Sequence, residues 1–304
     1  MKIHFSNVNF SSNSGPNSFA GRLANSLSNL GHKIVGENND YDSMLIFIEP
    51  SSRPRKGARI VQRLDGIWFK PEQFHTHNQM IKWAYDNSDA VIWQSKFDKE
   101  MTNHHWGSRT GAVIHNGITL GKANPFQKNI LAIRKSYKRV FVCSANWHRQ
   151  KRLKENTDLF LKLKEKYPES CLIVMGSNPD HYINHKDIFY TGSVPHSICL
   201  EVFSIADWMI HLAWLDHCPN VVVEALASEC PVICTDSGGT SEIVRNNGII
   251  IKENNPYFYE LTDYDMPYEL DIPSIDLPDI NINNSYLDIE KVAKKYIAVL
   301  SGDK

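Results

Sequence analysis

The sequence lacks the features that mark a membrane-spanning or secreted chain. No apolar run approaches the roughly 18 residues that a transmembrane helix needs. The N-terminal segment turns polar directly after Phe5, unlike a signal peptide. The six cysteines include no Cys-x-x-Cys pair, which favours buried free thiols over disulfides or a zinc site. We therefore expect a cytoplasmic protein and leave open a peripheral contact with a membrane surface.

A large net charge of either sign is also missing. The 304 residues contain 33 Lys and Arg against 34 Asp and Glu, which argues against a protein whose main partner is nucleic acid. The acidic residues are unevenly spread, because residues 253–285 hold eight of them and no Lys or Arg. The rest of the chain therefore carries a formal charge of +7, which suits anionic ligands. The length favours two domains.

Strand and helix patterns alternate along the first 252 residues. A strand over 2–8 is followed by a Ser- and Asn-rich loop over 9–18, and apolar residues then recur at helical spacing from Phe19 to Leu30. A second series begins at Arg139 with a strand, a basic loop and an amphipathic helix over 153–166. This alternation predicts an α/β fold with parallel sheets covered by helices.

Four segments follow from these patterns. We expect two Rossmann-like domains over 1–122 and 123–252, an acidic, Pro-rich linker on the surface over 253–284, and a C-terminal helix over 285–304. The apolar face of that last helix needs cover, so we expect it to dock on another part of the chain.

The segment from His211 to Leu226 carries the most chemical information. A strand is predicted to end near His211, and a helix begins near Asn220 after Pro219. The unpaired N–H groups of a helix start favour an anion such as a diphosphate. Asp216 could hold a sugar hydroxyl, and Glu224, one turn inside the helix, could accept both hydroxyls of a ribose. An ordinary helix start with Asp216 in a turn and Glu224 exposed competes with this interpretation.

The motifs around this segment keep a recognisable order. Asp216 and Glu224 are spaced D-x7-E and precede Ala225-Leu226-Ala227 and Pro231-Val232-Ile233, and then come Gly238-Gly239-Thr240-Ser241-Glu242-Ile243-Val244 and Asn247-Gly248. This order resembles the nucleotide-sugar-dependent glycosyltransferases of family 4, which carry E-x7-E at the first motif. The similarity spans about residues 2–252. It implies the GT-B fold, in which two Rossmann-like domains face a cleft and the C-terminal helix crosses back to the N-terminal domain.

The resemblance also implies roles for individual residues. Lys151 falls on the Lys of the family's R-x4-K motif and Asn146 on its Arg, with Arg149 as a nearby cation. These side chains and the N–H groups of Asn220 and Val221, after Pro219, would stabilise a leaving diphosphate. Glu224 would bind the ribose and Asp216 the transferred sugar, Val194 would lie where the base is received, and Gly15 would approach the donor phosphate. A solvated basic loop and ordinary turns also explain these segments.

The first domain, which the resemblance assigns to the acceptor, offers Asp65 as a third candidate catalytic residue beside Asp216 and Lys151. A turn Asp before Gly66 explains it equally well. Five cations could meet an anionic acceptor or a membrane surface, although a solvated face is the default: Arg53, Arg55, Lys56, Arg59 and Arg63. Four histidines lack the acidic or Cys partners of a metal site: His75, His77, His104 and His105. We interpret Ser95 as a helix N-cap and Asn116-Gly117 as a turn.

The activity implied is transfer of a hexosyl-type sugar, with retention of configuration, from a UDP- or GDP-sugar to a hydroxyl of a glycan or glycoconjugate. Neither a metal ion nor another cofactor is expected. Two alternatives remain. The departures at Asp216 and Asn146 are compatible with a catalytically silent protein that binds carbohydrate or nucleotide. A sugar-nucleotide epimerase or a phosphorylase would share the fold, but we find no clear motif for its acid/base set or cofactor lysine.

Overall fold

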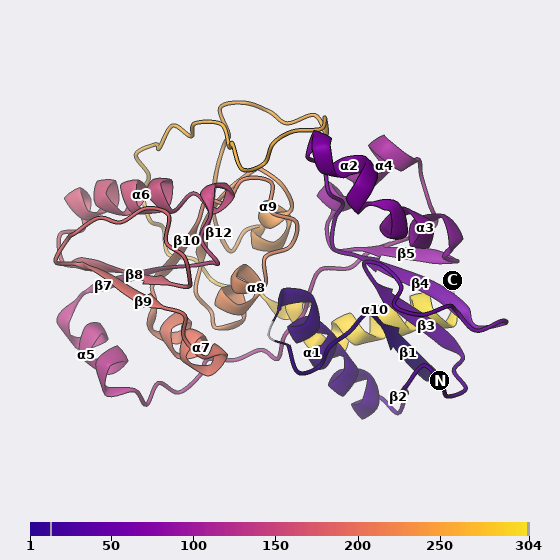
Figure 1. The fold of residues 1–304 in the computed structure, drawn as a ribbon. Helices are drawn as coiled ribbons and strands as arrows, with labels where there is room; N and C mark the ends of the chain where they lie inside the picture. Colours follow the sequence, from indigo (N-terminus) through magenta and orange to yellow (C-terminus); the bar gives the residue numbers. More distant parts are fainter. Residues whose placement is uncertain (13, 303–304) are drawn as a thin grey trace. The chain divides into compact units, whose positions relative to one another are not determined.

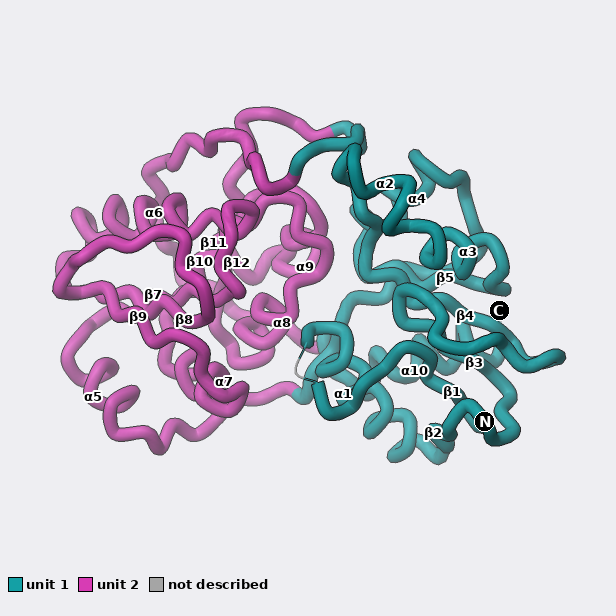
Figure 2. The backbone as a smooth tube through the Cα atoms, viewed as in Figure 1, with its two compact units in different colours: residues 1–119, 258–263, 286–304 teal, residues 120–257, 264–285 magenta. Residues whose placement is uncertain are grey.

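The fold is described from a computed structural model, which covers residues 1–12 and 14–302. The chain divides into two compact units (Figure 2). Unit 1 comprises Met1–Thr119, Phe258–Asp263 and Tyr286–Lys304, and unit 2 comprises Leu120–Tyr257 and Tyr264–Ser285. The division falls after Thr119, whereas the sequence patterns suggested residue 122. Residues 264–285, interpreted as part of a linker, belong to unit 2.

Unit 1 is built on a six-stranded parallel sheet (Figure 1). In sheet order its strands are β2 (Lys33–Val35), β1 (Lys2–Ser6), β3 (Ser43–Phe47), β4 (Arg59–Leu64), β5 (Ala90–Trp93) and β6 (Gly111–Val113). Its α-helices are α1 (Gly15–Asn29), α2 (Pro71–His77), α3 (Gln79–Asn87), α4 (Lys96–Trp106) and α10 (Ile289–Ser301). A 3-10 turn at Ser285–Leu287 leads into α10.

Helix α1 starts earlier than the sequence suggested. Residues 9–18 were expected to form a loop, but the helix begins at Gly15 with Pro16 in its first turn. Proline fits there because its fixed φ suits a helix and a first-turn N–H has no intrahelical acceptor. The polar composition of this turn therefore led to the wrong prediction of a loop at the helix start.

Helix α10 packs within unit 1, against α1 and strands β3 and β4. Its apolar side chains Val292, Tyr296 and Leu300 are buried in one cluster with Phe19 and Leu23 of α1. At its end, the backbone oxygen of Leu300 accepts a hydrogen bond of 2.9 Å from the hydroxyl of Ser43 in β3. The amphipathic pattern of this helix is explained by that cover.

Unit 2 repeats the architecture with a second six-stranded parallel sheet. In sheet order the strands are β12 (Gly248–Ile251), β11 (Val232–Thr235), β10 (Trp208–His211), β7 (Arg139–Ser144), β8 (Ser170–Met175) and β9 (Ile188–Gly192). The helices are α5 (Lys128–Ser136), the 3-10 helix η1 (Arg149–Lys151), α6 (Leu153–Lys166), α7 (His196–Ile205), α8 (Asn220–Ala227) and α9 (Thr240–Val244). The strand order reverses between β7 and β10.

The acidic segment after β12 has no regular helix or strand up to the 3-10 turn at Ser285, but it does not simply run over the surface as expected. Its apolar side chains pack against the core of unit 2: Leu270, Ile272, Ile275, Leu277 and Ile280. Asp271, Asp276 and Asp279 alternate with them and are exposed. The segment is therefore an extended amphipathic chain. Its high content of acidic residues and prolines gave no sign that its apolar side chains pack against the core.

Within the described residues, no helix is both long and apolar enough to cross a membrane. The expectation of an α/β fold with parallel sheets is confirmed by the strand pairings in both units.

Candidate functional site

The main candidate residues gather where two loops of unit 2 leave neighbouring strands. One loop follows β7 and contains η1, and the other follows β10 and leads into α8. Strands β7 and β10 are paired in parallel, so both loops leave the same edge of the sheet. The strand order reverses here, and open α/β sheets bind ligands at such a reversal, beyond the carboxyl ends of the strands.

Lys151 and Asp216, predicted on separate loops, meet in the structure. The Lys151 ammonium donates to Asp216 Oδ2 at 2.5 Å, and both side chains are largely buried. The Nε2 atom of His211, at the end of β10, lies 3.4 Å from the same oxygen. Burial by itself would raise the pKa of Asp216, but the charge of Lys151 and contact with His211 outweigh it and hold the pKa well below its usual range. Asp216 is therefore a carboxylate at neutral pH.

His211 was not among the predicted site residues. It is buried, and burial lowers its pKa even though Asp216 acts in the opposite direction. Asp216 thus has one cationic and one neutral neighbour. The signal available in the sequence was the position of His211 at the end of a buried strand, five residues before Asp216.

The backbone of Asp216 is held by the loop after β11. Its carbonyl accepts a hydrogen bond of 2.7 Å from Gly239 N–H, and the preceding Leu215 N–H donates to Ser237 Oγ at 2.9 Å. Gly238 has φ +69°, and a Cβ there would lie 2.5 Å from the Asp216 oxygen. The two adjacent glycines of the sequence motif therefore let one loop approach the other closely.

The basic loop after β7 does not present three cations to solvent. Arg149 is exposed, with Nη1 3.4 Å from the sulfur of Met266. Lys151 is paired with Asp216, and Arg152 points inward and is fully buried. Asn146 is exposed, and its side-chain oxygen accepts hydrogen bonds from Ser177 Oγ at 2.7 Å and Asn178 Nδ2 at 3.1 Å. The loop is therefore largely fixed by internal contacts.

Helix α8 begins at Asn220, directly after Pro219. The Pro219 carbonyl accepts from the N–H groups of Val222 and Val223 at 3.1 and 3.3 Å. Glu224 is buried, which contradicts the exposed position that the ordinary helix start gave it. Its Oε1 lies 3.0 Å from Nε2 of His196.

His196 is another neighbour that sequence reasoning missed. It is the first residue of α7, directly after the half-buried Val194 and the exposed Pro195. Its side chain is itself half exposed. No local pattern links it to Glu224, which lies on the next helix along the chain.

Two predicted site residues belong to unit 1. Gly15 is exposed at the first position of α1. Asp65 follows β4 and pairs with Arg63, whose guanidinium also donates to Asn116 Oδ1 at 2.8 Å. Arg63 is fully buried and lies over the rings of Phe19 and Phe47. The expected cationic face therefore lacks Arg63, and the Asp65 carboxylate has a structural partner.

The remaining sequence landmarks are structural. The Ser95 hydroxyl accepts from Asp98 N–H at the start of α4, so the predicted N-cap is confirmed. Asn116-Gly117 is not a turn. Asn116 is buried against Arg63, and a Cβ on Gly117 would lie 2.8 Å from Val292 of α10. Among the described residues, no group of three or more His, Cys, Asp or Glu side chains is arranged to hold a metal ion.

Comparison with known proteins relates this chain to glycosyltransferases. Residues 125–258 match the family described as glycosyl transferases group 1. A segment of 71 residues is 35% identical to TuaC of Bacillus subtilis (strain 168), named as a teichuronic acid biosynthesis glycosyltransferase. That match covers 23% of this chain and only 18% of the relative.

Solved structures resemble the chain over nearly its whole length. HepE from Anabaena, in complex with UDP, has a TM-score of 0.65 at 14% identity and covers 99% of this chain and 100% of its own. Sucrose-phosphate synthase from Thermosynechococcus elongatus has a TM-score of 0.62 at 13% identity, and the match covers 99% of this chain and 94% of the synthase chain. At such identities the likeness concerns the fold. The predicted GT-B fold is confirmed, with the glycosyltransferase group 1 match falling almost entirely on unit 2.

Proposed function

We propose that the protein is a glycosyltransferase that moves a sugar from a nucleoside diphosphate donor to an acceptor hydroxyl. The observation that carries the proposal is the Lys151–Asp216 pair beside the start of α8, within the segment that matches glycosyl transferases group 1. A cation and the positive end of a helix dipole suit a diphosphate, and a buried carboxylate suits sugar hydroxyls. Both kinds of group lie at the strand reversal of unit 2.

In the proposed reaction the negative charge grows on the diphosphate as its bond to the sugar breaks. Lys151, Arg149 and the N–H groups of Asn220 and Val221 stabilise that charge electrostatically. Lys151 must then share its ammonium between Asp216 and a phosphate oxygen. Asp216, kept ionised by Lys151 and His211, accepts hydrogen bonds from the transferred sugar.

Glu224 is assigned to the ribose hydroxyls. Its buried carboxylate is already oriented by His196 at 3.0 Å, so the ribose would either join this contact or replace it. The loop around Val194, directly before His196, is assigned to the base. We assign Gly15 and Asp65 of unit 1 to contacts with the donor phosphate and the reacting sugar or acceptor.

The finer chemistry is also proposed here. The resemblance to family 4 supports a hexosyl-type transfer with retention of configuration, with no metal ion or other cofactor, to a glycan or glycoconjugate. A UDP-sugar is the first donor to test, because HepE was solved with UDP and with UDP-glucose, and GDP-sugars are second.

The test begins with thermal unfolding in the presence of UDP-, GDP-, ADP- and CMP-sugars, since a ligand of the folded state raises the melting temperature. Donor hydrolysis is then measured with the sugar that binds. Lys151→Met should lower the turnover by about 10²–10³-fold, the usual effect of losing one group that stabilises developing charge. The matched control is Lys154→Met, because Lys154 is an exposed cation of α6 that pairs with Asp158.

Three outcomes contradict parts of the proposal. If no nucleotide sugar is bound or consumed, the enzyme assignment is wrong. Binding without turnover would favour the catalytically silent protein. If Glu224→Ala binds the donor as tightly as the unchanged protein, the ribose role is wrong. Glu229→Ala, at an exposed Glu just after α8, is the control for that variant.

A further inference from the structure

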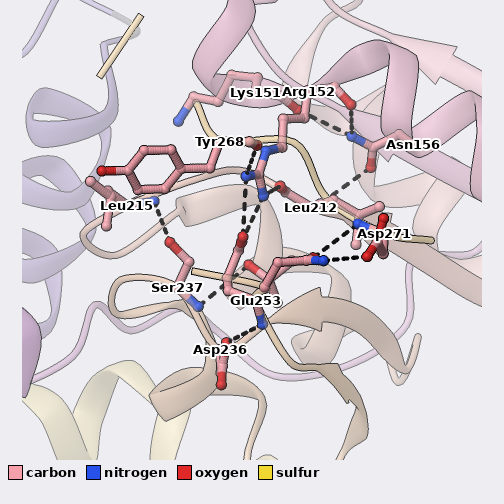
Figure 3. Close-up of polar contacts among 12 residues, drawn as sticks. Lys151, Arg152, Asn156, Leu212, Leu215, Asp236, Ser237, Glu253, Tyr268 and Asp271 are labelled. Atoms are coloured by element: carbon pink, nitrogen blue, oxygen red, sulfur yellow. Dashed lines mark hydrogen bonds and ion pairs between the residues drawn. The ribbon is translucent and has the colours of Figure 1, made fainter. Parts of the chain in front are cut away.

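Directly after Lys151, the chain buries a second cation that the proposed reaction does not use. Arg152 is fully buried, and its guanidinium makes two bonds to the carboxylate of Glu253, at 2.6 and 3.2 Å (Figure 3). It also donates to the backbone oxygen of Tyr268 at 2.7 Å. Its backbone has φ +53°, a left-handed conformation that non-glycine residues rarely adopt.

This ion pair is connected to both halves of the Lys151–Asp216 contact. On one side, Asn156 Nδ2 donates to the carbonyls of Lys151 and Arg152 at 3.1 and 2.6 Å. Asn156 Oδ1 accepts from Leu212 N–H at 3.3 Å, which ties the same turn to the loop that carries Asp216. The turn at Lys151 is therefore anchored to the loop after β10 (Figure 3).

On the other side, Glu253 N–H donates to Asp236 Oδ1 at 2.8 Å. The next residue, Ser237, accepts from Leu215 N–H at 2.9 Å, and Leu215 precedes Asp216. Hydrogen bonds and short stretches of backbone thus connect the turn at Lys151, through the Arg152–Glu253 pair and Asp236, to the backbone beside Asp216 (Figure 3).

Stability alone gives a weak reason for such an arrangement. Taking a guanidinium and a carboxylate out of water is costly, and well-packed apolar residues often serve the fold as well or better. The left-handed turn at Arg152 adds strain that its surroundings must compensate. Buried charges on a strained turn, next to a candidate catalytic residue, are better explained by a requirement for one geometry.

We propose that Arg152 and Glu253 are positioning residues that hold Lys151 against Asp216 in the orientation needed for donor turnover. The inference rests on the proposed glycosyltransferase function. The acidic segment takes part through its first residue, Glu253, and through the Tyr268 carbonyl. Asn254 and Asp271 join the two parts of the segment that carry Glu253 and Tyr268: the Asn254 side-chain amide donates to the Asp271 carboxylate, and the Asp271 N–H donates to Asn254 Oδ1 at 3.0 Å.

The experiment uses the full chain and three variants: Glu253→Gln, Arg152→Gly, and the double variant. Glu253→Gln removes one charge at constant size. Arg152→Gly removes the other, and glycine adopts a positive φ freely, so the turn stays allowed. The double variant restores charge balance in the buried site. Each is measured for melting temperature, for kcat and KM of UDP-glucose hydrolysis (or of the nucleotide sugar that binds), and for the rate at which an amine-acylating reagent labels Lys151, read by peptide mass spectrometry.

A positioning role predicts a lower kcat, by about 10–100-fold, with little change in KM, because misplacement of a group by an ångström has effects of that size. Lys151 should be labelled several-fold faster in all three variants. The melting temperature should fall in the single variants and recover in the double variant, while kcat stays low, because balanced charge does not restore the orientation.

Two results would overturn the proposal. One is a double variant whose kcat recovers along with its melting temperature, which a purely structural pair would give. The other is an unchanged labelling rate of Lys151 in variants that are folded. The labelling arm does not depend on catalysis. If the unchanged protein turns over no nucleotide sugar, the proposed function fails, while the labelling rates still decide whether the pair positions Lys151.

Discussion

Replacing Gly238 by alanine should disturb the backbone of Asp216. Gly238 has φ +69°, and a Cβ there would lie 2.5 Å from the Asp216 oxygen and 2.8 Å from its nitrogen. Both neighbours are backbone atoms, so neither can move aside without shifting the turn that presents the carboxylate. The left-handed conformation costs an alanine roughly 1–2 kcal/mol, and forcing a packed backbone apart costs about 1–3 kcal/mol more.

Gly192→Ala is a matched control for this change. Gly192 lies in the same unit with φ +68°, and nothing would come within 4 Å of its added Cβ. It therefore carries the conformational strain without the clash. The free energy of unfolding of Gly238→Ala should be lower than that of Gly192→Ala by about 1–3 kcal/mol.

Urea unfolding followed by tryptophan fluorescence measures both variants, because unit 2 contains the buried Trp147, Trp208 and Trp214. Donor turnover by Gly238→Ala should also fall, since the Asp216 carboxylate moves with its backbone. Equal unfolding free energies for the two variants would refute the argument, because the close approach of the two loops would then have no energetic consequence.

Two further predictions concern protonation. The pKa of Asp216 in the folded protein lies below its ordinary value of 3.8, so its contribution to stability is complete above that pH and is lost as the pH falls through the folded value. The difference in unfolding free energy between the unchanged protein and Asp216→Asn should stay constant from pH 7 to about pH 5 and shrink only below about pH 4; a difference that already shrinks near pH 6 would contradict this. Burial raises the pKa of the Cys171 thiol to about 12 and that of Cys199 to about 11. A colorimetric thiol reagent at pH 8 should therefore react slowly with the folded protein and reach all six cysteines only on unfolding. Rapid labelling of several thiols in the folded protein would contradict the expectation that they are buried.

The elements of the fold were largely predictable because their signals are local. Apolar residues recur along α1 and α6 at helical spacing, and short apolar runs bounded by polar loops predicted β7 and β8. The error at the start of α1 has the same origin. The Ser- and Asn-rich stretch suits a loop in isolation, and only the tertiary contacts of Phe19 and Leu23 favour an extra helical turn before them.

The candidate site was predictable in its residue types but not in its contacts. Asp216 and Lys151 were named from their motifs, yet their hydrogen bond joins residues 65 positions apart. The bond between Arg152 and Glu253 spans 101 positions, and Arg63 reaches Asn116 across 53. No local pattern separates an arginine that will be buried beside a distant carboxylate from one that will face water.

Charge counting therefore misjudged where the positive potential of this protein lies. The +7 left after removing the acidic segment was interpreted as suited to anionic donors, but that segment supplies Glu253, which neutralises Arg152 inside unit 2. Arg63 is likewise paired inside unit 1, and Lys151 is paired with Asp216. Of the three cations in the loop after β7, Arg149 alone is exposed. Under the proposed function, attraction of a diphosphate would then depend on Arg149, on the start of α8, and on how readily Lys151 shares its ammonium between Asp216 and a phosphate. In our proposal, this sharing of the Lys151 ammonium depends on the geometry of its turn and not on the net charge. The buried Arg152–Glu253 ion pair holds that geometry.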